Sequence, residues 1–173
     1  MNEMSEPTAI DYNKQVTQLA EHDGRQAIRD ELVSAGRAGL NAMKQGFQHA
    51  NWRVRRECVA FMDHHARQDC VQGLLRALKD SNQTVRRNAI HSLSCDRCKP
   101  SPLQVDSIPM ILDVARNDVS LRVRRSAVIL LTEKKPDSRV VPALLEMQSR
   151  ETDQRLLKLI VRAIKQHESA VIR

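Results

Sequence analysis

Apolar residues recur along this chain with helical spacing, and one short phrase opens several of these stretches. The phrase is a valine followed by two arginines, and a small residue and further apolar positions follow each full copy at helical intervals. It stands at Val54-Arg55-Arg56, Val85-Arg86-Arg87 and Val123-Arg124-Arg125, with a degenerate copy at Gln154-Arg155-Leu156. The copies are 31, 38 and 31 residues apart. A period near 31 residues predicts stacked repeats that bury their apolar faces against one another.

Short polar turns divide the chain from Thr8 onward into about ten helical segments, which predict five antiparallel pairs. The expected spans are 8–21 with 24–35, 37–48 with 51–64, 67–79 with 82–95, 105–117 with 120–133, and 137–150 with 153–167. Residues 1–7 are polar and lack periodicity, so we expect a mobile tail followed by a single domain over 8–173. Only 2% of the residues are aromatic, and this composition favours helix-on-helix packing. We therefore expect an all-α protein.

The second helix of two predicted pairs carries the same ordered set of residues. The sets are Asp80, Val85, Arg86 and Ala89, and then Asp118, Val123, Arg124 and Ala127. This order resembles the HEAT-repeat family, in particular its short, phycobilisome-lyase-like branch, over roughly residues 23–167. The resemblance implies a right-handed α-solenoid of about five helix pairs, with an Asp–Arg ladder between repeats. The ladder should be weaker where the pattern changes, at His49, Ser149 and Gln154.

The chain is basic, with 28 Lys and Arg against 21 Asp and Glu and a net charge of +7. This balance favours an anionic partner. The resemblance assigns Arg55, Arg86 and Arg124 to the ladder, and it places the second helices on the concave face. Five further arginines have no such assignment, and we expect them to bind the partner: Arg53, Arg56, Arg87, Arg122 and Arg125. An acidic protein segment is the expected ligand, nucleic acid is the alternative, and a merely solvated face is the third possibility.

The longer interval between the second and third copies contains seven extra residues, which predict an inserted loop at 94–104. The loop carries a Cys-x-x-Cys motif at Cys95 and Cys98, the spacing with which a tetrahedral zinc takes two ligands. His64 lies one repeat before Cys95, and Cys70 follows it across a turn. We therefore predict one structural zinc bound by His64 (or His65), Cys70, Cys95 and Cys98, with His91 in reserve. The alternative is a set of reduced thiols and solvated histidines.

The remaining features argue against catalysis. The chain contains no Gly-rich phosphate loop, nucleophile elbow, His-Glu-x-x-His or EF-hand pattern. Glu57 and Asp69, two acids near the histidines and Cys70 in the sequence, belong to no recognisable catalytic motif, and Cys58 aligns with the small core positions Ala89 and Ala127. We expect a non-enzymatic binding scaffold. The first residues lack the apolar core of a signal peptide and no stretch is long and apolar enough to span a membrane, so we expect a cytoplasmic protein without membrane contacts.

Overall fold

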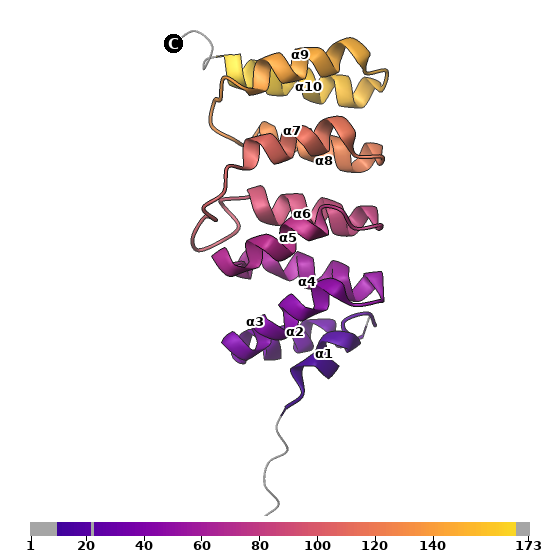
Figure 1. The fold of residues 1–173 in the computed structure, drawn as a ribbon, viewed down its shortest axis with the longest axis vertical. Coiled ribbons are helices and arrows are strands. Elements are labelled where there is room, and N and C mark those ends of the chain that lie inside the picture. The colour runs from indigo at the N-terminus through magenta and orange to yellow at the C-terminus, as the bar shows by residue number, and fades with distance from the viewer. Residues whose placement is uncertain (1–9, 22, 169–173) are drawn as a thin grey trace, which may run out of the picture. The chain divides into compact units, whose positions relative to one another are not determined.

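The computed structural model describes residues 10–21 and 23–168, in which every regular element is helical (Figure 1). The helices are α1 (Tyr12–Gln18), α2 (Arg25–Ser34), α3 (Arg37–Gln45), η1 (Gly46–Gln48), α4 (Trp52–His65), η2 (Gln68–Cys70), α5 (Val71–Ala77), α6 (Gln83–Ser94), α7 (Ser107–Asn117), α8 (Leu121–Leu131), α9 (Val140–Arg150) and α10 (Gln154–His167). The predicted all-α class and the helix order are confirmed. The predicted tail, 1–7, lies outside the described residues.

The chain divides into two compact units, and the division falls inside α4, between Cys58 and Val59. The first unit contains α1, α2, α3 and the beginning of α4, packed around Leu32 and Met43, which are fully buried. Gly46 closes this packing, because a Cβ atom at that position would meet the sulfur of Cys58 and lie 2.9 Å from Val16 Cγ1. Cys58 is therefore a core thiol, as the repeat alignment predicts. Its burial raises its pKa to about 12.

The second unit is a stack of three helix pairs, α5 with α6, α7 with α8, and α9 with α10 (Figure 1). The second helices α6, α8 and α10 lie side by side in this order, which is the arrangement of an α-solenoid. Ala89 of α6 and Ala127 of α8 are fully buried at the small positions of their repeats. Small side chains there let neighbouring helices approach closely, so the recurring alanines are a packing requirement.

Local sequence explains where these helices begin. The side-chain oxygen of Asn82 accepts a hydrogen bond from the Thr84 N–H at the start of α6, and Asp153 does the same for the Leu156 N–H at the start of α10. Both are side-chain caps of otherwise unpaired amides. Pro109 and Pro142 lie in the first turns of α7 and α9, where a missing N–H leaves no helical bond unmade.

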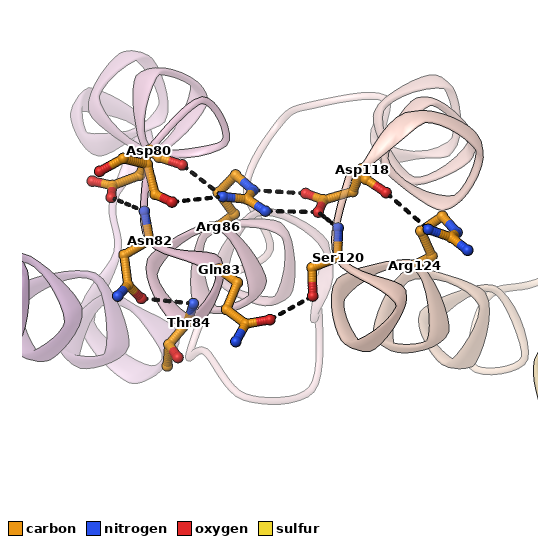
Figure 2. Close-up of polar contacts among 9 residues, drawn as sticks. Asp80, Asn82, Gln83, Thr84, Arg86, Asp118, Ser120 and Arg124 are labelled. Atoms are coloured by element: carbon orange, nitrogen blue, oxygen red, sulfur yellow. Dashed lines mark hydrogen bonds and ion pairs between the residues drawn. The ribbon is translucent and has the colours of Figure 1, made fainter.

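An arginine ladder joins successive repeats of the second unit (Figure 2). The Arg86 guanidinium binds both carboxylate oxygens of Asp118 in the next repeat, at 2.7 and 2.8 Å, and also donates to the main-chain carbonyl of Asp80 at 2.8 Å. Burial raises the pKa of Asp118, but the bonds from Arg86 and from the Ser120 N–H outweigh it and hold that pKa below its usual value. Arg86 thus binds its own repeat through main-chain oxygens and the following repeat through a carboxylate.

The next rung differs in its acid. Arg124 donates to the main-chain oxygen of Asp118, and its forward partner is Glu151, 3.6 Å away. The sequence pattern has Ser149 in place of the family's aspartate, and Glu151 supplies the missing charge two residues later. The longer, weaker pair agrees with the expectation of a weaker ladder at this repeat.

Candidate metal centre and binding groove

Four potential metal ligands gather in the second unit, where the inserted loop leaves α6. The four are Asp63 of α4, His91 of the last turn of α6, and Cys95 and Cys98 of the loop, and their ligand atoms all lie within 4.8 Å of one another. The Cys98 sulfur is 3.6 Å from His91 Nε2, and this nitrogen is 3.2 Å from Asp63 Oδ1. The two sulfurs are 2.6 Å apart. This group, with one oxygen, one nitrogen and two sulfur donors, can hold a metal ion.

The end of α6 brings these residues together. Cys95 follows the last helical residue in an extended conformation (φ −76°, ψ 109°), so the chain leaves the helix axis and turns back toward the preceding turn, where His91 lies. The Ser92 hydroxyl donates to the main-chain oxygen of Val59 at 3.1 Å, which fixes α6 against the second half of α4. Asp63 lies one turn further along α4 and therefore faces the loop.

The observed group differs from the predicted zinc ligands. Cys95, Cys98 and the reserve ligand His91 belong to it, but His64 and Cys70 do not. His64 Nδ1 lies 2.9 Å from the main-chain oxygen of Cys98, and the sulfur of Cys70 contacts Asp69 at 3.5 Å. The repeat arithmetic assumed that both compared positions were helical. Cys95 is extended, so its side chain does not point where a helical residue one repeat after His64 would point.

His65, the other histidine considered, stacks on the ring of Phe61 with their centroids 4.2 Å apart. Burial and the nearby His64 lower its pKa. This residue packs with the apolar side of α4, outside the four-residue group.

One acid and one ammonium group flank the two thiols of the group. Burial raises the pKa of Asp63, but His91, Lys99 and His64 outweigh it, so the carboxylate is ionised near neutral pH. The pKa of Cys98 is raised to about 12, first by its contact with the Cys95 sulfur and then by burial and Asp63. The Lys99 ammonium is buried beside these groups and donates to the main-chain oxygen of Cys95 at 2.7 Å. A metal ion would lower the thiol pKa values and bind both sulfurs as thiolates.

Polar contacts hold the inserted loop, which runs from Cys95 to Asp106, on both sides. Gln68 and Gln104 exchange two hydrogen bonds, at 2.9 and 3.3 Å, between the loop and the turn before α5. Lys134, after α8, donates to Asp96 at 2.8 Å. Arg97 pairs with Glu133 at 2.9 Å. The sequence did not predict these polar contacts.

A groove of about 400 Å³ lies along α6 and α8, next to the metal-ligand group. Arg87 lines it, Ile129 and Leu130 give it an apolar wall, and Asp63 and His91 also contribute to its lining. Ile129 is 43% exposed, which is unusual for an isoleucine on a packed helix. The groove thus combines a cation, an apolar surface and acids in one hollow.

The five predicted partner-binding arginines have different environments. Arg125 binds both carboxylate oxygens of Asp153, so it is a structural residue between α8 and α10. In the first unit, Arg56 pairs with Glu57, while the Arg53 guanidinium lies 5.1 Å from the ring centre of Trp52. Arg87 is half-buried in the groove, and Arg122 lies close enough to lower its pKa, after burial as the larger cause. Among the described residues, Arg53, Arg87 and Arg122 are the predicted arginines without a carboxylate partner, and of these Arg87 and Arg122 belong to the second unit.

Sequence reasoning missed several buried polar residues. Glu57 is 4% exposed and forms ion pairs with Arg25, Arg29 and Arg56 within the first unit. Asp63 could have been found from the register, because Ala60 lies one repeat before His91 and Asp63 lies one turn beyond Ala60. The closeness of His91 to Cys95 in the sequence was a second usable signal.

Comparison with known protein families decides the classification. A family model of HEAT repeats matches residues 40–131, which is more than half of the chain. The chain belongs to the HEAT-repeat family. Proteins built from HEAT repeats commonly serve as scaffolds for protein interactions. The match does not separate the phycobilisome-lyase-like branch, which stays a prediction.

Two further results bear on the identity of the chain. No curated protein matches the chain significantly. Among the described helices, none has the length and apolar character that crossing a membrane requires.

Proposed function

We propose that this HEAT-repeat chain is a non-enzymatic scaffold that binds an acidic segment of a partner protein in the groove along α6 and α8. Arg87 and Arg122 would hold a carboxylate of that segment. The observation that carries the proposal is the half-buried guanidinium of Arg87, which lines the groove next to a second cation.

The electrostatics of Arg87 support an anionic ligand. Burial and the neighbouring Arg122 both lower the pKa of Arg87, so its positive charge is poorly compensated in the free protein. A ligand carboxylate would compensate this charge, and an arginine can bind it through two parallel hydrogen bonds. Arg125 already forms two such bonds, to the carboxylate of Asp153. We therefore treat Arg125 as a structural residue and Arg87 as a ligand-binding one.

The rest of the groove favours a peptide over a nucleic acid. Ile129 and Leu130 offer an apolar wall for an aliphatic side chain, and Asn88 and Ser126 can bond to a main chain. Asp63 and Glu133 also line the groove and would repel a phosphate backbone. Trp52, the single tryptophan, lies beneath Arg53 and Arg56 in the first unit, and so offers no stacking platform in this groove.

The proposal includes no catalytic step. Glu133 is paired with Arg97, and Asp63 belongs to the metal-ligand group, where the neighbouring thiols would bind the metal and would not act as nucleophiles. We also propose that the metal-ligand group holds one structural zinc ion, and that the protein acts in the cytoplasm, as its sequence suggests.

The test compares partner capture by three forms of the full chain. Wild type, Arg87→Glu/Arg122→Glu and the control Arg76→Glu/Lys79→Glu are immobilised and exposed to a lysate of the cells that make the protein, with and without nuclease treatment. The control reverses two exposed cations at the end of α5, so it changes the net charge equally but leaves the groove intact. Captured proteins are identified, and the affinity of each is then measured with purified protein.

We expect wild type and control to bind the same protein with similar affinity, and the groove variant to lose at least tenfold in affinity. An unchanged affinity of the groove variant would contradict the proposal. Capture that disappears in all forms after nuclease treatment would identify nucleic acid as the ligand instead.

A further inference from the structure

We propose that Asp63, His91, Cys95 and Cys98 are the four ligands of a zinc ion. This inference deepens the structural zinc of the proposed function, because it names a ligand set that the sequence did not predict. It does not depend on the identity of the groove's partner.

The distances suit a tetrahedral ion. Zinc bonds of about 2.0–2.3 Å place neighbouring donors roughly 3.3–3.8 Å apart. The contacts of His91 Nε2 with the Cys98 sulfur, at 3.6 Å, and with Asp63 Oδ1, at 3.2 Å, are already close to this range. The Cys95 and Cys98 sulfurs, at 2.6 Å, must separate by about 1 Å to bind the same ion.

One atom of the group points to a missing ligand. Asp63 Oδ1 is buried and has no hydrogen-bond partner among the described atoms, although His91 Nε2 is 3.2 Å away. A buried carboxylate oxygen without a partner is costly, and a metal ion would satisfy it. The buried oxygen without a partner therefore marks Asp63 as the fourth ligand, beside His91, Cys95 and Cys98.

Neighbouring residues support the four ligands from outside. His64 Nδ1 meets the main-chain oxygen of Cys98 at 2.9 Å and can hold the loop at this point. The buried Lys99 ammonium balances the charge of the loaded site, because zinc with two thiolates and one carboxylate carries a single negative charge. His64 therefore has a supporting position in place of its predicted ligand role.

The donor types select zinc among the common metals. Two thiolates and an imidazole suit zinc, whereas magnesium and calcium require oxygen donors. The four side chains come from α4, α6 and the loop, so the ion would link two successive repeats to the insertion. A closed set of four protein ligands is typical of a structural site.

The experiment measures metal binding by the reduced full-length protein. Zinc affinity is determined by chelator competition, and cobalt(II) is used as a spectroscopic probe, since thiolate charge-transfer bands and the intensity of the d–d bands report sulfur ligands and tetrahedral geometry. The ligand variants are Asp63→Asn, His91→Gln and Cys98→Ser. Two variants of the set predicted from sequence, His64→Gln and Cys70→Ser, test the rival assignment, and Cys58→Ala is a core-thiol control.

We expect one zinc per chain and tetrahedral cobalt with two thiolates. Cys98→Ser should lower zinc affinity at least about 100-fold, and Asp63→Asn and His91→Gln at least about 10-fold, while Cys70→Ser and Cys58→Ala leave it unchanged. Circular dichroism of each variant shows whether it folds. Zinc binding that requires Cys70 but tolerates Asp63→Asn would overturn the ligand set and keep a structural zinc. The absence of zinc binding by folded, reduced wild type would overturn both.

Discussion

Replacing Arg86 by alanine tests the ladder that joins the repeats of the second unit. The change removes two charge-assisted bonds to Asp118 and one each to the main-chain oxygens of Asp80 and Ser81. Bonds of this kind contribute about 1.5–3 kcal/mol each. The two side chains are only 11% and 6% exposed, so water replaces little of the loss. Because the Ser120 N–H still binds Asp118, we expect a loss below that sum and close to what breaking a buried ion pair typically costs, about 3–4 kcal/mol.

The assay is urea unfolding of the full chain followed by far-UV circular dichroism. Arg116→Ala is the matched control, because its pair with Glu146 has a similar distance, 2.9 Å, but side chains that are 37% and 47% exposed. An exposed pair contributes less than about 1 kcal/mol. Arg86→Lys should recover only part of the loss, since lysine keeps the charge without the two-pronged geometry. Equal destabilisation by Arg86→Ala and Arg116→Ala would refute the reasoning.

The same pair predicts a dependence on acid. The pKa of Asp118 lies below its usual value in the folded protein, so the pair's contribution is complete above the usual carboxyl pKa and is lost as pH falls toward the folded value. Wild type should therefore lose stability more steeply than Arg86→Ala below about pH 4. Parallel acid profiles of the two proteins would contradict this assignment.

Three further changes test other parts of the fold. His167→Ala should lower the free energy of unfolding by about 2–4 kcal/mol, because the buried ring accepts a hydrogen bond from the Asp137 N–H and donates one to the Leu131 carbonyl. Thermal unfolding measures the loss, and a value below about 1 kcal/mol would show that these two hydrogen bonds contribute little. Glu57→Gln should lower the free energy of unfolding by about 2–3 kcal/mol in a urea titration, since several partly exposed arginines lose their common anion; an unchanged midpoint would show that the cluster is not stabilising. Ala127→Leu should cost about 1–3 kcal/mol by overpacking a fully buried helix junction, and a neutral result would place that junction elsewhere.

Repeat periodicity predicted the fold well because a solenoid is built from local patterns. The phrase at Val85 and Val123 marks buried helix positions, and Asn82 caps a helix where its side chain predicts a start. Each of these features depends on residues within a few positions of one another. Sequence alone can therefore place the helices of a HEAT repeat to within a few residues.

The candidate site was less predictable because it depends on a break in the helical pattern. The repeat register predicted His64 as a ligand only because it treated Cys95 as helical. Cys95 is extended, and the loop that follows it lies beside His91 and Asp63. The sequence also could not predict which arginines pair with carboxylates. Arg125 and Arg87 occupy similar phrases, yet only the tertiary arrangement gives Arg125 a carboxylate partner at Asp153.

The most direct test of the proposed function is an NMR titration that observes the arginine side chains of the groove. A synthetic peptide rich in glutamate and leucine is added to labelled full-length protein, and the Nε–Hε signals are followed. The account predicts saturable shifts of Arg87 and Arg122 together with the methyl groups of Ile129, while Arg125, already bound to Asp153, stays unchanged. Shifts spread over all exposed cations without saturation, or an unperturbed Arg87, would contradict it.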